Sequence, residues 1–157
     1  TTFPTLNTSE TTGEAILEAR VKNMLTNTAW TVTKTDVLAS PSNYFVNNYW
    51  SQEHYDLFGH ITGAYRIFED LKLDGVKYLD PSKAIVTYCY TGQTSAITSA
   101  WLEVLGYDAK SLMFGANGIV HSQLLVGAPK VTWGGDGSGF NLNFGYYDKD
   151  GNLHDKL

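Results

Sequence analysis

The sequence has little of several residue types, and each shortage excludes a class of protein. Its 157 residues include one cysteine and four prolines. A single cysteine cannot form a disulfide within the chain, so cysteine usage does not indicate the redox compartment. It also excludes a metal site built from several cysteines. No apolar run approaches the roughly 18–20 residues that a bilayer-spanning helix needs, so we expect no membrane span.

Positive charge is scarce as well. The chain has 11 Lys and Arg against 16 Asp and Glu, which gives a net charge of −5 at pH 7. Because the basic residues form no cluster, we expect no nucleic-acid-binding surface. The four histidines (54, 60, 121 and 154) are scattered and match no zinc-ligand spacing. The sequence therefore predicts no metal and no other cofactor.

The composition that remains is that of a packed globular protein. Apolar residues make up 43% of the chain, with 4 Trp, 10 Tyr and 7 Phe, and the length suits one domain over residues 1–157. Low charge beside many Thr, Asn, Gly and Tyr is compatible with an exported or periplasmic protein, the alternative being a cytoplasmic one. Because the chain starts at Thr1 rather than Met, removal of a signal peptide is one hypothesis.

Helical and strand patterns alternate along most of the chain. Leu17, Val21, Met24 and Leu25 share one face of a predicted helix over residues 13–25. After residue 129 the pattern changes to glycine-rich and strand-like segments, which predict an appended hairpin or arm. Between them, alternating strands and helices predict a parallel sheet that is covered on both faces. The predicted strands are 30–33, 44–49, 84–88 and 111–114, followed by 141–147 in the arm. A short helix is predicted after the cap Thr35-Asp36 and should end before Pro41. Further helices are predicted over 51–57, capped by Ser51, over 96–105 and over 118–126.

The apolar run 84–88 ends at Cys89, and a glycine-containing loop leads from there into a helix. Such a loop points successive backbone N–H groups inward, next to the positive end of the helix dipole. A cysteine at its mouth should hold an anionic sulfur species well. The apolar stripe predicted for the helix is Ala96, Ile97, Ala100, Trp101, Val104 and Leu105. This arrangement predicts covalent sulfur chemistry at Cys89.

Three motifs together resemble the rhodanese-like superfamily. They are Gly59-His60-Ile61-x-Gly63-Ala64, Cys89-x-x-Gly92-x-x-Ser95 and Leu105-Gly106-Tyr107-Asp108-Ala109, in this order. The segment Gly115 to Gly118 also looks like a glycine-containing loop of that family. The resemblance covers about residues 31–125. It implies an α/β fold with a roughly five-stranded parallel sheet flanked by helices. An N-terminal helical extension over residues 1–29 and a C-terminal β arm over residues 129–157 lie outside it.

The resemblance also implies an activity. Cys89 would take a sulfane sulfur from a polysulfide, a persulfide or thiosulfate, and pass it as a persulfide to a thiol or cyanide. Gly92 lets the backbone curl around the sulfur, and Ser95 or Thr94 would cap the helix. The predicted substrate-binding residues are Tyr90, Thr91, Gly92, Gln93, Thr94, Ser95 and Trp50.

Departures from the family pattern narrow the expected substrate. Loops that use thiosulfate commonly carry Arg or Lys where this chain has Tyr90 and Thr94, so a dianionic donor should bind weakly. Trp50 ends Asn48-Tyr49-Trp50, where many members have Asp-x-Arg; it either makes the pocket mouth apolar or packs in the core. Phosphatases of this fold need Cys-x5-Arg, and the arginine position is Ser95, which argues against phosphatase activity. A non-catalytic binding or sulfur-carrier module remains the alternative.

Two histidines near these motifs have different expected roles. His60 lies in the glycine-bracketed turn, where a structural role is expected rather than that of a general base. His121 follows a glycine-containing segment near the predicted pocket, so a site role and a purely structural one both stay open.

Overall fold

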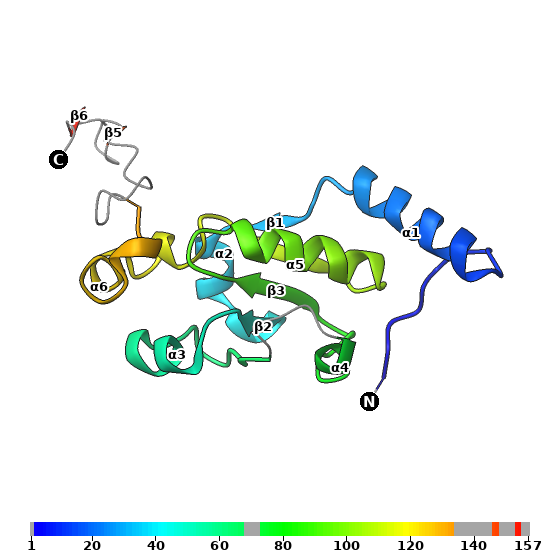
Figure 1. Ribbon diagram of the computed structural model, residues 1–157, viewed down its shortest axis with the longest axis horizontal. Helices are drawn as coiled ribbons and strands as arrows, with labels where there is room; N and C mark the ends of the chain where they lie inside the picture. Colours follow the sequence, from blue (N-terminus) through cyan, green and yellow to red (C-terminus); the bar gives the residue numbers. More distant parts are fainter. Residues whose placement is uncertain (1, 68–72, 134–145, 148–152, 155–157) are drawn as a thin grey trace.

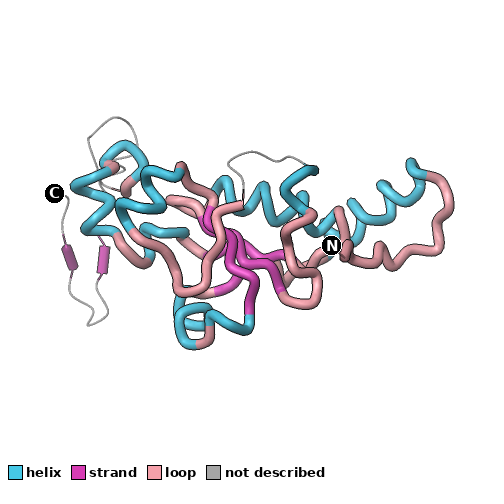
Figure 2. The backbone as a smooth tube through the Cα atoms, turned by 90° about the horizontal axis from the view of Figure 1, so that it is seen from below, coloured by secondary structure: helices cyan, strands magenta, loops and turns pink. Residues whose placement is uncertain are grey.

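A parallel sheet forms the centre of the molecule. The structure is a computed structural model that describes residues 2–67, 73–133, 146–147 and 153–154 (Figure 1). Its main sheet has the strand order β1-β4-β3-β2, and all neighbouring strands are parallel. The predicted parallel sheet is therefore confirmed, and Figure 2 shows its strands side by side between the helices. The strands are β1 (Thr31–Val32), β2 (Tyr44–Asn48), β3 (Ala84–Tyr88) and β4 (Ala109–Leu112).

The described part of this sheet has four strands, one fewer than the roughly five expected for this architecture. Among the described residues, the sheet continues beyond β2 as a parallel bridge between Asn47 and Tyr65. The Tyr65 N–H donates to the Val46 carbonyl at 2.9 Å, and the Asn48 N–H donates to the Tyr65 carbonyl at 2.8 Å. These two hydrogen bonds cover the outer edge of β2.

Helices connect and cover the strands. Ser51 caps α3 as predicted, because its hydroxyl accepts the His54 N–H at 3.2 Å. The predicted cap of α2 is wrong. Thr33 caps this helix, because its hydroxyl accepts the Asp36 N–H at 3.2 Å and donates to the Asp36 carboxylate at 2.6 Å. The α-helices are α1 (Gly13–Thr26), α2 (Lys34–Ala39), α3 (Gln52–Phe58), α4 (Leu73–Val76), α5 (Gln93–Val104) and α6 (His121–Gly127).

The three 3₁₀ turns are η1 (Pro41–Asn43), η2 (Gly115–Gly118) and η3 (Pro129–Val131). The helix predicted over 118–126 begins later, at His121, since η2 occupies the residues before it. None of the described helices has the length and apolarity that crossing a bilayer requires.

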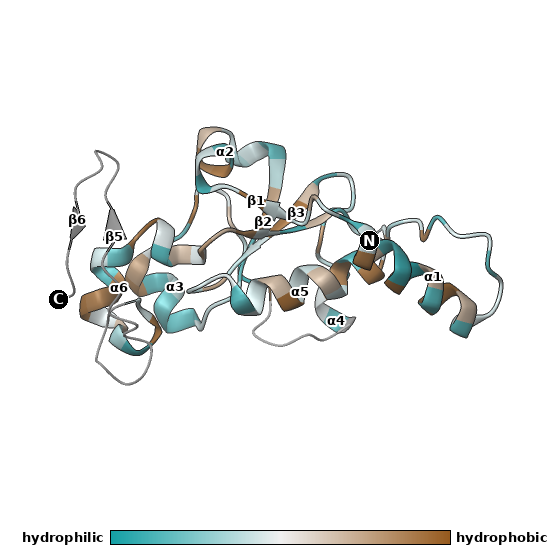
Figure 3. Cartoon of the chain, turned by 90° about the horizontal axis from the view of Figure 1, so that it is seen from above, coloured by the Kyte–Doolittle hydropathy of each residue, from teal (hydrophilic) through white to brown (hydrophobic). Residues whose placement is uncertain are grey.

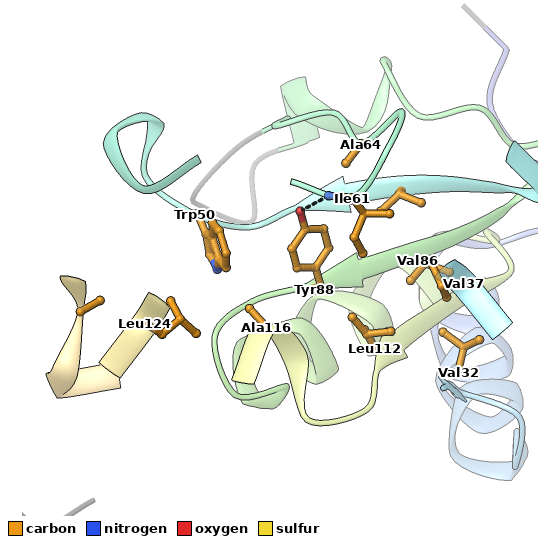
Figure 4. Packing of buried hydrophobic residues seen from close by; sticks show 12 residues of the cluster. Val32, Val37, Trp50, Ile61, Ala64, Val86, Tyr88, Leu112, Ala116 and Leu124 are labelled. Carbon is orange, nitrogen blue, oxygen red and sulfur yellow. Dashed lines mark hydrogen bonds between the residues drawn. The ribbon is translucent and has the colours of Figure 1, made fainter. Parts of the chain in front are cut away.

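Side chains of β3 alternate between two hydrophobic clusters, one on each face of the sheet. Ile85 packs with Leu102 of α5, whereas Val86 and Tyr88 pack on the other face with Val37 of α2 (Figure 4). Figure 3 shows α2 on one side of the strands and α4 and α5 on the other. Both faces are covered, as the strand pattern predicts.

The predicted apolar stripe of α5 is only partly confirmed: Trp101 and Leu105 pack against the cluster that contains Leu102, but the stripe is not the buried face. The buried residues of this helix are Ser95, Thr98, Ser99 and Leu102, and Ile97 is 62% exposed. Ser95 has a partner on the sheet, since its hydroxyl bonds to that of Ser111 of β4 at 2.7 Å. The Thr98 hydroxyl is satisfied within the helix, because it donates to the Thr94 carbonyl at 2.9 Å.

The N-terminal extension is tied to α5 by one arginine. The predicted helix is confirmed as α1, but two residues of its predicted apolar face, Leu17 and Leu25, are exposed. The buried residue of this helix is Arg20, whose guanidinium donates to the backbone carbonyls of Glu103 and Val104 at the end of α5. It also reaches the Leu6 carbonyl at 3.4 Å. Figure 1 shows α1 at that end of α5.

The described part of the C-terminal arm is η3 together with one antiparallel strand pair. The strands are β5 (Tyr146–Tyr147) and β6 (Leu153–His154). The strand predicted over 141–147 is confirmed only at its end, because residues 141–145 lie outside the described residues.

Candidate functional site

The thiol of Cys89 lies at the carboxyl end of β3 and accepts two backbone N–H groups. The Gly92 nitrogen is 3.2 Å from Sγ and the Ser95 nitrogen is 3.4 Å away. The cysteine is 3% exposed. Both donors belong to the loop and first turn that lead into α5, so the chain curls around the sulfur at the positive end of the helix dipole. This geometry suits a sulfur atom that carries negative charge.

Gly92 makes the curl possible. It has φ of +95° and is the N-cap of α5, which begins at Gln93. The prediction that Ser95 or Thr94 caps the helix is therefore wrong. The left-handed conformation at Gly92 starts the helix early and places the Ser95 N–H toward the sulfur.

Ser95 joins the cysteine loop to the sheet. Its hydroxyl donates to the Gly92 carbonyl at 3.0 Å and forms a hydrogen bond with the Ser111 hydroxyl at 2.7 Å. The Cys89 thiol is 3.7 Å from the same oxygen. A phosphatase of this fold needs an arginine at this position, and here the position is filled by a buried hydroxyl that is committed to the loop and to β4.

The remaining predicted loop residues lie toward the surface. Gln93 and Thr94 are exposed, and the Thr91 hydroxyl donates to the Gln93 side-chain oxygen at 3.1 Å. Tyr90 is half-buried, and its hydroxyl contacts Nδ1 of His54. Of the predicted donors, the amides of Gly92 and Ser95 reach the sulfur, and the substrate-binding roles of the others stay predictions.

Trp50 lies beneath the loop. Its ring is stacked on Tyr90 with centroids 5.1 Å apart, and it meets Tyr88 and Phe58 edge-on. It is 2% exposed, and its backbone carbonyl accepts the Arg66 Nε–H at 2.7 Å. This placement matches the core-packing alternative for Trp50 and makes it the support on which Tyr90 rests.

The structure adds three residues that the motifs did not single out for the site. His54 of α3 contacts the Tyr90 hydroxyl. Gly115 of η2 has φ of +53°, and a Cβ there would lie 2.5 Å from the Cys89 carbonyl oxygen. The only sequence signal for Gly115 is the glycine-containing segment that begins with it.

Asn117 is the third residue. Its side-chain amide donates to the carbonyls of Tyr90 at 2.7 Å and Val131 at 3.1 Å, and its oxygen accepts the Trp133 N–H at 3.0 Å. Its own N–H also donates to the Tyr90 carbonyl at 2.9 Å. Asn117 therefore fastens the cysteine loop to the segment that follows α6. No sequence motif indicates this role.

The histidines that the sequence placed near the motifs lie away from the sulfur contacts. His60 is exposed and stacks on Tyr55, with centroids 4.0 Å apart. His121 is exposed, with Nε2 2.9 Å from the Trp133 carbonyl oxygen. In the described part of the chain, no three His, Cys, Asp or Glu side chains gather as metal ligands would.

The residue before the cysteine is a buried tyrosine. The Tyr88 hydroxyl accepts the Ile61 N–H at 3.2 Å, a contact drawn in Figure 4. Burial raises the pKa of the Tyr88 phenol above its usual 10.0. The glycine-bracketed turn that contains Ile61 is thus held against the strand that ends at Cys89.

Comparison with known proteins agrees with this geometry. A family model described as Rhodanese-like domain matches residues 48–121, and no curated protein matches the chain. The BH2092 protein from Bacillus halodurans is a similar solved structure, with 20% identity over 64% of this chain and 77% of that chain and a TM-score of 0.51. This similarity shows the fold.

Two further solved structures have TM-scores below 0.5. One is a rhodanese-related protein from Thermoplasma volcanium, with 18% identity over 63% of this chain and 94% of that chain and a TM-score of 0.46. The other is a protein of unknown function from Rhodopseudomonas palustris, described as a possible tyrosine phosphatase. It has 18% identity over 69% of this chain and 89% of that chain and a TM-score of 0.44.

Proposed function

We propose that this chain, whose residues 48–121 match the model described as Rhodanese-like domain, is a sulfurtransferase that carries sulfane sulfur as a persulfide on Cys89. The observation that supports this most directly is the pair of N–H groups, from Gly92 and Ser95, that meet the Cys89 sulfur at 3.2 and 3.4 Å. Fixed N–H dipoles stabilise a thiolate without a neighbouring base. Once Cys89 carries a persulfide, we expect the N–H groups of this loop to face its outer, charged sulfur.

The proposed reaction has two displacement steps. The Cys89 thiol first loses its proton to solvent, and the thiolate attacks the outer sulfur of a donor persulfide or polysulfide. A new S–S bond forms on Cys89 while the S–S bond of the donor breaks, and the donor leaves as a thiolate. In the second step an acceptor thiolate, or cyanide, attacks the outer sulfur of the Cys89 persulfide. Cys89 leaves as a thiolate, and the acceptor becomes a persulfide or thiocyanate.

The absence of positive charge in the loop affects which sulfur donor it can bind. Residues 90–95 contain no Lys or Arg, so the neutral groups of the loop and the dipole of α5 must do the binding there. Charge-assisted hydrogen bonds are roughly twice as strong as neutral ones, which disfavours a dianionic sulfonate. The loop suits a donor of lower charge, such as a persulfide or a short polysulfide, better than thiosulfate.

A donor panel tests this function. The protein is reduced and incubated with thiosulfate, inorganic polysulfide or glutathione persulfide, and its intact mass is then measured. We expect polysulfide and glutathione persulfide to add the mass of one sulfur atom, and an added thiol to remove it. Cys89→Ser should stay unmodified. If every donor leaves the wild-type mass unchanged, the enzymatic proposal is wrong.

The second candidate is a non-catalytic module that uses the same loop for binding or sulfur storage. The burial of Cys89, 3% exposed, favours this alternative. The two candidates differ in the second step. A protein that becomes persulfidated but returns its sulfur to no thiol and to no cyanide on the time scale of loading is a carrier rather than a transferase.

A further inference from the structure

Residues that follow three neighbouring strands meet at one edge of the main sheet. In the strand order β1-β4-β3, Lys34 comes two residues after β1, Phe114 two residues after β4, and Cys89 directly after β3. The three strands are parallel and lie side by side (Figure 2), so these residues share the carboxyl edge of the sheet. Open parallel sheets bind their ligands at this edge.

Phe114 holds a backbone conformation that a bulky residue rarely adopts. Its φ is +63°, in the left-handed region, where Asn and Asp are much commoner than Phe. Such strain is destabilising and concentrates at functional sites. The side chain gains little burial, because the residue is 56% exposed. Burial therefore does not explain a phenylalanine at this position.

A second exposed ring extends that of Phe114 into an aromatic surface. Trp133 is 40% exposed and meets Phe114 edge-on, with ring centroids 5.5 Å apart. Its backbone N–H donates to the Asn117 side-chain oxygen at 3.0 Å, and the Asn117 amide donates to the Tyr90 carbonyl at 2.7 Å. The aromatic surface is therefore anchored to the loop that holds the Cys89 sulfur.

Phe114 also adjoins that loop directly. A Cβ on Gly92 would lie 3.4 Å from the Phe114 nitrogen, and the Gly92 N–H donates to the Cys89 sulfur at 3.2 Å. One residue of the loop thus lies between the Phe114 backbone and the thiol.

A cation lies on the other side of Phe114. The Lys34 Cδ and the Phe114 Cβ are both 3.7 Å from the position that a Cβ on Gly118 would take. Lys34 is exposed, and its Nζ donates to the Gly118 carbonyl at 2.6 Å. An ammonium group has three N–H donors, more than this bond uses. A molecule that extends from Cys89 past Phe114 would therefore meet a positive charge.

We propose that the aromatic surface and Lys34 bind the organic part of the sulfur donor, and that this donor is an organic persulfide with an aromatic or apolar body and a carboxylate. The inference rests on the proposed sulfurtransferase function. When the Cys89 thiolate attacks the outer sulfur of R–S–SH, the new S–S bond forms, the S–S bond of the donor breaks and R–S⁻ leaves. The outer sulfur keeps its proton. The group R extends out of the cysteine loop, where the rings contact it and the Lys34 ammonium pairs with its carboxylate.

Three donors test the proposal on the full chain. Inorganic polysulfide has no organic part, benzyl persulfide has the ring, and para-carboxybenzyl persulfide has the ring and a carboxylate. Persulfide formation on Cys89 is followed by intact mass over a range of donor concentrations. We expect the half-saturating concentration to be about tenfold lower for the carboxylated donor than for benzyl persulfide.

Phe114→Asn removes the ring and relieves the strain, because asparagine tolerates the left-handed region. It should raise the half-saturating concentration of both benzyl donors by about fivefold or more, leave polysulfide unchanged and not lower the Tm. Tyr78→Asn, at another exposed ring, is the control and should change none of the three. A lower Tm with equal losses for all donors would show that Phe114 is structural and would overturn the inference.

Lys34→Met should remove the advantage of the carboxylated donor over benzyl persulfide. Its matched control is Lys83→Met, because Lys83 is also exposed and also donates to a backbone carbonyl, that of Ser42 at 2.8 Å. Lys83 comes directly before β3, at the opposite edge of the sheet, so its loss should leave the advantage intact. Equal effects of the two substitutions would overturn the inference.

A ligand that cannot react separates this inference from the function on which it rests. The thioether para-carboxybenzyl methyl sulfide is titrated into Cys89→Ser, and the indole N–H resonances of the ¹⁵N-labelled protein are followed by NMR. We expect a saturable shift of the Trp133 resonance, and an unshifted one would overturn the inference. Failure of every donor to load Cys89 would instead overturn the sulfurtransferase function. Loading by polysulfide without any preference between the benzyl donors would leave the function standing and overturn the inference alone.

Discussion

A Cβ on Gly115 would lie 2.5 Å from the carbonyl oxygen of Cys89, closer than any real contact of this kind. The same atom would be 2.8 Å from the Gly92 nitrogen. The turn after β4 therefore packs backbone against backbone on the cysteine loop. Two hydrogen bonds complete the contact. The Ala116 N–H donates to the Cys89 carbonyl and the Asn117 N–H donates to the Tyr90 carbonyl, each at 2.9 Å. The loop that holds the thiol has a second, sequence-distant loop as its support.

Gly115→Ala should break this support. The new methyl group meets backbone atoms that cannot move aside, and φ of +53° adds backbone strain. We expect the free energy of unfolding to fall by about 2 kcal/mol or more. The cradle should also loosen, so persulfide formation on Cys89 should slow in the intact-mass assay.

Gly118→Ala is the matched control for that substitution. This glycine lies in the same 3₁₀ turn, but a Cβ there would have its nearest neighbour at 3.7 Å. The control should keep both stability and persulfidation close to wild type. Equal effects of the two substitutions would contradict the steric explanation.

Asn117→Asp should detach the cysteine loop from the segment after α6. The substitution replaces the two donors that serve the Tyr90 and Val131 carbonyls with a carboxylate oxygen. The Val131 carbonyl then loses this donor, the Tyr90 carbonyl keeps only the Asn117 backbone N–H, and both face a negative charge, so we expect the free energy of unfolding in urea to fall by about 2 kcal/mol. Asn43→Asp, at an exposed position, should change stability little. An equally large loss of stability in Asn43→Asp would mean that the added negative charge, and not the lost hydrogen bonds, destabilises the protein.

Thr94→Arg should widen the donor range of the proposed sulfurtransferase. Thr94 is exposed in the first turn of α5, where a guanidinium can reach an anion beside the sulfur. We expect kcat/KM for thiosulfate to rise by about tenfold and the rate with glutathione persulfide to change much less. Ile97→Arg adds the same charge one turn further along α5 and is the control. Similar gains from both variants would mean that general electrostatic attraction causes the effect.

The buried phenol of Tyr88 should make the fold sensitive to alkaline pH. Burial raises its pKa above the usual 10.0, so the unfolded chain loses this proton at lower pH than the folded one. The stability that the neutral phenol contributes is complete below about pH 10 and is lost as pH rises through the folded pKa.

We therefore expect the free energy of unfolding, measured in urea from about pH 9 to pH 11, to decline at the upper end of this range. Tyr88→Phe should make the decline shallower, whereas Tyr78→Phe, which changes an exposed ring, should not. An unchanged slope in Tyr88→Phe would show that other groups cause the alkaline loss.

Local signals in the sequence predicted the elements that carry the thiol. The β3 run, the cap at Ser51 and the position of Cys89 between a strand and a helix all follow from short patterns, which depend on few distant contacts. The start of α5 was misplaced for a physical reason. Ser95 has a good capping side chain, but a left-handed Gly92 begins the helix earlier, and the Ser95 hydroxyl bonds to Ser111 instead.

The support around the loop could not be predicted in the same way. The contacts of Asn117 with Tyr90 and Trp133, and of His54 with Tyr90, join segments far apart in the chain. No periodicity or motif encodes such pairs. The orientation of α5 is a related case, because hydrophobicity alone places Ile97 inside, whereas in the structure Ser95 is buried and its hydroxyl bonds to Ser111 of β4.

Arg20 links the N-terminal extension to the end of α5 that lies away from Cys89. Its guanidinium meets the last carbonyls of α5, the negative pole of the helix whose positive pole faces the Cys89 sulfur. A cation at the carboxyl end of a helix is favourable because it offsets the partial negative charge there. A fragment trimmed to the core of residues 31–125 would therefore keep residues 89–95 but leave the last carbonyls of α5 without the Arg20 guanidinium.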